Sequence, residues 1–223
     1  MNPNRKLWNQ QQQALRQNLA RAFNHQKAIE LFLSQHAMLH AAEMSHAGVW
    51  SFEDEILDDM TGAQMRVIPR NCDHSIAWMF WHMARIEDVT MNLLVAGSPQ
   101  LLLRDGWFGR MQVNVRDTGN AMDAAGVADL SVRIDLQALR AYRLSVGRRT
   151  REIVKQLRPE ELKHKVDPAR LRQMTEEGAV VEAAGGVLEY WGGLTTAGLL
   201  LMPPTRHNFV HLNEALRVKQ KTR

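Results

Sequence analysis

Histidine is the residue type in this chain whose placement says most about chemistry. Nine histidines occur among 223 residues, and His207 and His211 stand four positions apart in RHNFVHLNEALRVK. On a helix, side chains at i and i+4 lie one above the other, with Cβ atoms about 5–6 Å apart, so two imidazoles can reach one metal ion. Asn208 occupies the position of the glutamate in the HExxH motif, so the pair does not predict a zinc protease of that kind.

His82 is the candidate for a third ligand. It lies one helical turn from Trp78 and one from Ile86, on an apolar stripe. A lone histidine on such a stripe is more often a core residue with one buried hydrogen bond. Together with an HxxxH pair from another helix it makes three nitrogen ligands, and three protein ligands with an open fourth position are typical of catalytic zinc sites.

A second pair competes with the first. His36 and His40 have the same i, i+4 spacing in SQHAMLHAAEMSH, and His46 follows. Spacing alone does not choose between the pairs, and His36 and His40 are equally compatible with the core or with the wall of a site. The remaining histidines are predicted to be exposed or capping residues: His25, His74 and His164.

Few other side chains qualify for chemistry. Glu214, three residues after His211, is a candidate partner for a ligating imidazole, which usually gives its second N–H to a carboxylate or carbonyl. Glu87 and Asp88 are expected to be solvated or paired with arginine. Cys72 and Ser75 lie in no recognisable nucleophile motif, so we assign them structural roles.

The larger aromatic residues are expected to be mostly packing residues, one or two of which line a small-molecule pocket near the metal. They are Trp50, Trp78, Trp81, Trp107, Tyr190 and Trp191.

Composition narrows the class of protein. Apolar residues make up 45% and charged residues 23%, as in ordinary globular proteins, and one cysteine excludes an internal disulfide or a multi-cysteine cluster. The N-terminus has no apolar signal region, and the run near Leu199 is too short to span a bilayer. A net charge of +4 is mild, and no nucleic-acid motif accompanies it. We expect one cytoplasmic domain over residues 1–223 that binds neither nucleic acid nor membrane.

The first half of the chain predicts three helices. Residues 5–43 lack proline and glycine and predict one long helix, bent near Asn24. Ser51 and the acidic residues after it predict a short helix. Residues 62–72 are expected to be a loop. Asp73 is the expected cap of a helix from about His74 to the stop signal at residues 97–99.

The second half predicts two more long helices. Residues 100–130 are expected to be mostly irregular, and Ser131 to cap a helix that ends near residue 157. Residues 158–195 predict short helical pieces, and the last helix is expected from Pro203 or Pro204 to Lys219. Strand signals are limited to residues 111–115 and 179–182. The sequence therefore predicts an all-α four-helix bundle with long inter-helix loops and short extra helices, a fold that builds metal sites in its core.

The segment HSIAWMFWHMARIEDVTMNLL, followed about 125 positions later by MPPTRHNFVHLNEALRVK, resembles the DinB-like superfamily of bacterial four-helix-bundle metalloproteins. That superfamily includes YfiT-type metal-dependent hydrolases and mycothiol- and bacillithiol-dependent S-transferases. The resemblance implies that three histidines hold a divalent metal, nickel or zinc before iron or manganese. They correspond here to His82, His207 and His211. Residues 100–130 and 158–200 exceed the connections of a minimal member, which predicts a lid, a dimer surface or a narrower pocket.

These residues support two classes of function. The first is a metal-dependent enzyme, of thiol S-transferase or hydrolase type, that acts on a small molecule at the open metal position. No motif identifies a site for a low-molecular-weight thiol. The second is a non-catalytic, stress-related helical bundle whose structural or sensory metal has a fourth protein ligand, for which Glu214, His36 and His40 are the candidates. A histidine-rich core without metal is the third possibility. In each case we expect a homodimer.

Overall fold

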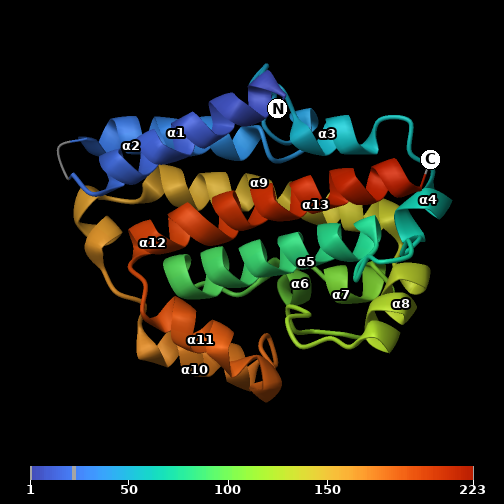
Figure 1. Ribbon diagram of the computed structural model, residues 1–223. Helices are drawn as coiled ribbons and strands as arrows, with labels where there is room; N and C mark the ends of the chain where they lie inside the picture. Colours follow the sequence, from blue (N-terminus) through green and yellow to red (C-terminus); the bar gives the residue numbers. More distant parts are fainter. Residues whose placement is uncertain (1, 22–23, 223) are drawn as a thin grey trace.

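The computed structural model describes residues 2–21 and 24–222 and is built of helices joined by loops, the longest of which in the described part spans residues 111–123 (Figure 1). The described residues contain no strand, and a single isolated bridge pairs Lys165 with Thr195. The segments with strand signals, 111–115 and 179–182, are therefore not strands. The all-α class predicted from the sequence is confirmed. None of the described helices combines the length and apolar character needed to cross a membrane.

The helices fall into long elements that make the body and short ones that cover it. The long elements are α1 (Pro3–Leu19), α2 (His25–Ala37), α5 (Ile76–Asp88) with its π-helical continuation η3 (Val89–Ala96), α9 (Leu136–Gln156) and α13 (Asn208–Lys221). The short elements are η2 (Ala42–Met44), α3 (Phe52–Leu57), α4 (Gly62–Arg66), α6 (Leu101–Arg104), α7 (Trp107–Arg110), α8 (Ala124–Arg133), η4 (Pro159–Lys163), α10 (Pro168–Glu176), η5 (Glu182–Ala184), α11 (Gly185–Gly192), α12 (Thr196–Leu201) and the π-helical η6 (Met202–His207).

The N-terminal segment forms two helices, where the sequence predicted one bent helix. α1 and α2 lie side by side across the top of Figure 1, and residues 22–23 between them lie outside the described part of the chain. A continuous helix of this length would extend past the body of the protein. The reversal lets Leu15 and Leu19 of α1 share one apolar cluster with Ile29 and Phe32 of α2.

Helix α5 occupies the centre of the molecule and is buried along its whole length. It packs against both α9 and α13, and it runs below α13 in Figure 1. Ser75 caps it by accepting a hydrogen bond from the Trp78 N–H at 3.0 Å, so the predicted cap at Asp73 is wrong by two residues. The predicted end is confirmed, because the continuation η3 stops at Gly97. A helix buried on every face carries its charged residues into the core as well.

Several predicted boundaries shift in the middle of the chain. Part of the loop expected at residues 62–72 forms α4, and the excursion at residues 100–130 contains α6, α7 and the start of α8. Ser131 lies inside α8 and pairs with the Ser75 hydroxyl at 2.7 Å. Asp135 caps the following helix, α9, by accepting from the Ala138 N–H. The short helical pieces expected after residue 158 are confirmed.

The last helix begins earlier than predicted. α12, η6 and α13 follow one another without a break, so Pro203 and Pro204 lie inside a helical run. A proline removes one backbone donor and leaves the carbonyl of the preceding turn free. The Thr205 hydroxyl donates to Leu200 O at 2.8 Å, which satisfies that carbonyl, and the Gln12 amide donates to Leu201 O at 2.9 Å. The helix therefore continues through the prolines in a π-helical turn and carries His207 at its junction with α13.

Candidate metal centre

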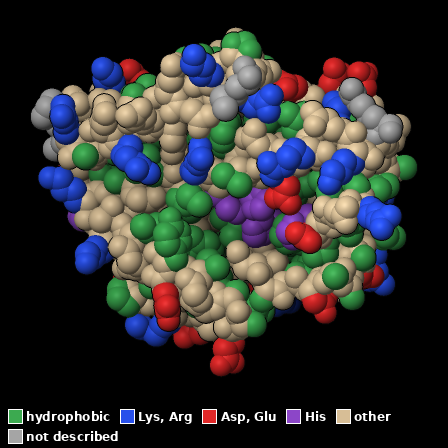
Figure 2. Space-filling model, in the orientation of Figure 1, with side chains coloured by type: hydrophobic (Ala, Val, Ile, Leu, Met, Phe, Trp, Pro, Cys, Tyr) green, Lys and Arg blue, Asp and Glu red, His purple; other side chains and the backbone are tan. Residues whose placement is uncertain are grey.

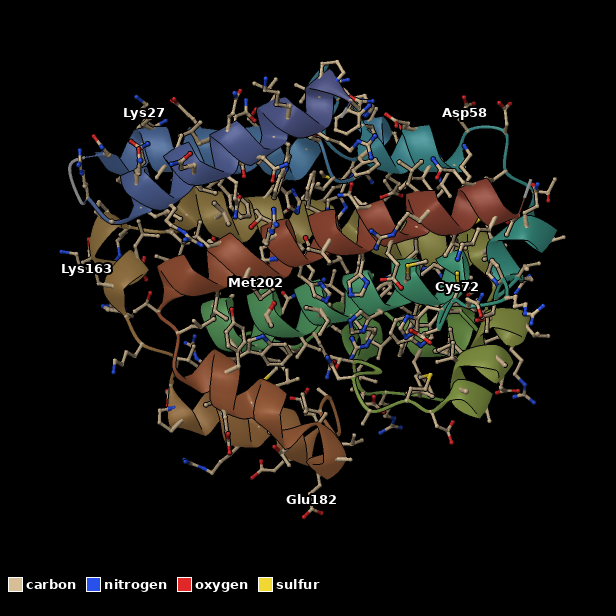
Figure 3. All side chains as sticks on the ribbon, in the orientation of Figure 1. Lys27, Asp58, Cys72, Lys163, Glu182 and Met202 are labelled. Atoms are coloured by element: carbon tan, nitrogen blue, oxygen red, sulfur yellow. The ribbon has the colours of Figure 1, made fainter. Side chains whose placement is uncertain are left out.

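Three histidines from three elements converge where α5 meets the junction of η6 and α13. Each of His82, His207 and His211 offers a ring nitrogen, and these three atoms lie within 4.8 Å of one another. The Nε2 atoms of His82 and His207 are 3.1 Å apart. Figure 3 shows the side chains that fill the space between α5 and the helical run that contains Met202. Figure 2 shows histidine side chains reaching the surface near the middle of one face, beside acidic side chains. The structure thus brings together the three predicted residues.

Contacts on the far side of two rings determine which nitrogen each ring presents. His82 Nδ1 lies 2.5 Å from the backbone oxygen of Thr118. Because a carbonyl oxygen only accepts hydrogen bonds, His82 carries its proton on Nδ1 and has a lone pair on Nε2. His211 Nδ1 lies 3.0 Å from Glu214 Oε2, which leaves its Nε2 as the free nitrogen. Glu214 therefore has the role that the sequence predicted, as a partner of a candidate ligand.

The donor set fits a divalent cation. Two ring nitrogens as close as those of His82 and His207 share either a proton, as in a hydrogen bond, or a cation that lies between them. Neutral imidazoles are common zinc ligands at about 2.0–2.1 Å. In a tetrahedral site those bonds place two nitrogens about 3.3 Å apart, close to the 3.1 Å between His82 and His207. Their contacts to a carbonyl and a carboxylate are the partners that metal-bound imidazoles usually have.

Electrostatics keep the cluster in the form that a metal requires. Burial, and then the charge of His211, lowers the pKa of His82 to about 3. Burial and the neighbouring histidines hold the pKa of His207 well below its ordinary value. Hydrogen bonds from His211 and then His74 lower the pKa of Glu214. At neutral pH the site therefore has neutral nitrogens at His82 and His207 and an ionised carboxylate behind His211.

His74 belongs to the wall of this site, although the sequence placed it among exposed or capping residues. Its ring stacks on Trp78 with centroids 3.9 Å apart, and Trp78 stacks on His82 at 4.7 Å. His74 Nδ1 also lies 3.3 Å from Glu214 Oε1. A sequence signal did exist, because residues 74, 78 and 82 are spaced four apart, as on one helical face, although α5 itself begins at Ile76.

The segment 117–120 contributes to the site through its backbone. Thr118 supplies the carbonyl to His82, and Gly119 follows with φ of +78°. A Cβ at Gly119 would lie 2.6 Å from the Trp81 ring, so the close approach requires glycine. Sequence reasoning missed this contact, because a backbone carbonyl leaves no side-chain signature. The turn-forming residues around Asp117, whose carboxylate accepts from the Gly119 N–H, are the one signal that could have indicated a tight loop here.

A small apolar cavity of about 130 Å³ adjoins His207. Ile86, Val187 and Pro203 supply apolar surface, and Tyr190 and Trp191 of α11 are the two predicted aromatic residues that line it. Both long connections therefore contribute to the pocket, since Asn120 comes from one and α11 from the other. Larger hollows of about 620–760 Å³ lie along α1 and contain no histidine. The small cavity is the one placed to hold a molecule at the site.

The competing pair, His36 and His40, lies in the core around Glu87. His36 Nε2 is 2.8 Å from Glu87 Oε1, and His40 Nε2 is 3.1 Å from Glu87 Oε2. All three residues have an exposed fraction of 0%. Asn208 Nδ2 donates to Glu87 Oε2 at 2.8 Å. Gly147 of α9 leaves room for the ring, because a Cβ there would lie 2.9 Å from His40 Nδ1.

The expectation that Glu87 is solvated or paired with arginine is therefore wrong. Burial by itself would raise the pKa of Glu87, but His40 and His36 more than offset this, and its pKa lies well below the ordinary value. Burial lowers the pKa of His40 to about 3. An ionised carboxylate thus accepts hydrogen bonds from imidazoles in the core, and this grouping could also hold a metal ion.

The other residues considered for chemistry have structural contacts. Asp88 is buried and pairs with Arg85 at 3.3 Å, so of the two predicted alternatives, solvation or pairing with arginine, the second is confirmed. It also accepts a hydrogen bond from the Tyr142 hydroxyl at 2.6 Å. Cys72 is partly buried, and the Lys221 amine lies 3.3 Å from its sulfur. Ser75 is the helix cap described above. His46 and His164 are exposed, as predicted for His164.

Comparison with known proteins places the chain in a family. The family model of the DinB superfamily matches residues 49–186, which is more than half of the chain and includes His82. His207 and His211 lie beyond the matched segment. No curated protein matches the chain. The match agrees with the helical fold and with histidine groups that could hold a metal ion, as is typical of this family. The chain belongs to the DinB superfamily.

Proposed function

We propose that this protein binds one divalent metal ion, nickel or zinc, through His82, His207 and His211, and that it is a metal-dependent enzyme acting on a small molecule. The observation that carries the proposal is the convergence of three ring nitrogens within 4.8 Å, two of them fixed from behind by Thr118 and Glu214. When bound at such a site, a divalent ion lowers the pKa of a coordinated water or thiol and polarises the group that is attacked.

The candidates for a fourth protein ligand are hydrogen-bonded to other residues, which favours an enzyme over a structural metal site. A structural zinc site has four protein ligands. Of the residues that could supply a fourth, Glu214 is hydrogen-bonded to His211 and His74, while His36 and His40 are hydrogen-bonded to Glu87. Among the described residues the group at His82 has three members. A fourth position is therefore available to a small molecule.

The surroundings of the site define what this chain does for a substrate. The cavity beside His207 is mostly apolar and small, so it suits an uncharged electrophile of a few carbon atoms and limits the entry of water. Trp78 packs on His82 and fixes the orientation of its ring. Glu214 accepts a hydrogen bond from His211 and keeps a negative charge at the edge of the site, where its side chain is 27% exposed.

The two reaction types differ only in the nucleophile, which is water for a hydrolase and a low-molecular-weight thiol for an S-transferase. We favour the transferase, because the superfamily includes S-transferases that use mycothiol or bacillithiol. We also propose that the protein works as a homodimer. Sedimentation velocity of the purified full-length chain tests the dimer.

Elemental mass spectrometry on protein purified without a histidine tag tests the metal. We expect close to one nickel, zinc, iron or manganese per chain, and none in the His207→Ala/His211→Ala variant. A screen of thiols against small halides, epoxides and activated alkenes then separates the two reactions, with ester hydrolysis as the parallel assay. Wild-type protein that stays metal-free in excess metal would contradict the proposal.

A further inference from the structure

Two buried polar atoms next to each other in the chain lack hydrogen-bond partners. They are Nδ1 of His207 and Oδ1 of Asn208. A buried polar atom without a partner is costly, and an imidazole N–H and an amide oxygen are a complementary donor and acceptor. The two atoms belong to consecutive residues and are not hydrogen-bonded to each other in the structure.

The Asn208 amide is oriented from its other end. Its Nδ2 donates to Glu87 Oε2 at 2.8 Å and approaches Pro204 O at 3.4 Å, so Oδ1 is the end that remains for His207. Glu87 is held in turn by His36 and His40, and all four side chains in this arrangement are fully buried. Such a cluster can transmit an orientation because packing leaves its members no alternative rotamer.

We propose that the buried cluster of His36, His40 and Glu87 positions His207 through Asn208. Glu87 holds the amide so that Asn208 Oδ1 accepts from the His207 Nδ1–H. Nε2 of His207 then faces His82 and His211, and all three candidate ligands have a partner behind the ring. The proposal rests on the proposed function only in taking His207 as a metal ligand.

A second metal ion in the buried cluster is the competing interpretation, since its side chains lie close enough together. The hydrogen bonds argue against it. The Nε2 atoms of His36 and His40 are the ones that contact Glu87, and both are engaged as donors to the carboxylate. A metal would need those same nitrogens in their deprotonated form.

The test is the tautomer of each histidine in the metal-free full-length protein, read from long-range proton–nitrogen spectra of ¹⁵N-histidine-labelled samples. We expect His207 to carry its proton on Nδ1, and His36 and His40 to carry theirs on Nε2. The Asn208→Leu variant should move the His207 proton to Nε2, the preferred position in free imidazole. Its affinity for Zn²⁺ should fall about 10- to 100-fold.

Gln35→Met is the matched control, because Gln35 is a fully buried amide whose side-chain atoms have no partner. It should change neither the His207 tautomer nor the Zn²⁺ affinity. Glu87→Gln tests whether the carboxylate orients the Asn208 amide. Without that charge the amide should lose its single orientation, and His207 should then show a mixture of tautomers.

His207 protonated on Nε2 in the wild type, or unchanged in Asn208→Leu, overturns the proposal, and so does binding of two Zn²⁺ per chain. The wild-type spectrum decides even if a variant does not fold. Expected tautomers in a protein that binds no metal would support the positioning contact while the proposed function fails.

Discussion

The two histidine clusters have the same local pattern and different surroundings. Each contains an i, i+4 pair that meets one residue of α5, yet His207 and His211 meet His82, whereas His36 and His40 meet Glu87. In the first cluster three ring nitrogens converge within 4.8 Å, and among the described residues no carboxylate belongs to the group. In the second, imidazole N–H groups meet an ionised carboxylate and the polar atoms satisfy one another. The identity of one facing residue therefore separates a candidate metal site from a buried hydrogen-bonded cluster.

Depth separates the clusters further. His40 and Glu87 are fully buried, while His211 and Glu214 have side chains that are 16% and 27% exposed. A metal site that exchanges a small molecule must reach the surface, and a cluster that orients other residues is most effective when it is packed on all sides.

The largest expected effect is on metal content. His207→Ala/His211→Ala should reduce bound metal from about one ion per chain to none, because one imidazole cannot hold a divalent ion. His36→Leu/His40→Leu should leave one ion per chain with weaker affinity. Elemental mass spectrometry on both variants measures this. If the His36→Leu/His40→Leu variant lost its metal while the other variant kept it, the metal site would have to be the cluster around Glu87.

For stability, the buried cluster of His36, His40 and Glu87 should matter more than the candidate metal site. His36→Leu/His40→Leu leaves the buried carboxylate of Glu87 with Asn208 as its partner and should lower the free energy of unfolding by about 3–5 kcal/mol. Adding Glu87→Leu removes the charge, so the triple variant should regain much of that loss. Urea unfolding of the metal-free proteins compares them. A triple variant less stable than the double would show that the carboxylate is not the source of the cost.

The metal-free protein should lose stability as the pH falls from about 6.5 towards 3. An unfolded histidine binds its proton near pH 6.5, whereas the pKa values of His40 and His82 are about 3 in the folded protein. Between these values the unfolded state holds more protons, so each histidine contributes about 1.4 kcal/mol per pH unit.

Denaturant unfolding across this range measures the slope. His40→Leu should reduce it by about 1.4 kcal/mol per pH unit, and an unchanged slope would mean that His40 is protonated in the folded protein.

The smallest expected effect concerns the carbonyl behind His82. Gly119→Ala should cost about 1–3 kcal/mol, because the residue has φ of +78° and a Cβ would contact Trp81 at 2.6 Å. Gly178→Ala is the matched control, with φ of +67° and nothing within 4 Å of the added carbon. It should cost about 1 kcal/mol and leave Zn²⁺ affinity unchanged. Equal Zn²⁺ affinities in the two variants would show that the Thr118 carbonyl does not support the site.

Much of the fold was predictable because it depends on local rules. The end of the central helical run at Gly97, the short helix after Ser51 and the all-helical class follow from capping residues and apolar periodicity. The errors lie where packing overrides those rules. The N-terminal helix reverses to bury both halves, and Pro203 and Pro204 stay within a helix because Thr205 satisfies a carbonyl that proline leaves free.

The site divides in the same way. The sequence was sufficient to nominate His82, His207 and His211 from spacing and from a family resemblance, and Glu214 from its distance to His211. It did not reveal His74 as part of the wall, the Thr118 carbonyl, or the burial of Glu87 between two histidines. Each of these depends on elements far apart in the chain.

By itself, the sequence determined which residues share a helical face, since that follows from a repeat of 3.6 residues per turn and needs no partner. The tertiary structure alone decided which face meets which. His82 and Glu87 stand five residues apart on one buried helix. The histidines at 207 and 211 meet the first, whereas those at 36 and 40 meet the second. The burial of apolar surface drives that packing. Whether a histidine pair forms a candidate metal site or a hydrogen-bonded cluster therefore depends on the residue that packing places opposite it.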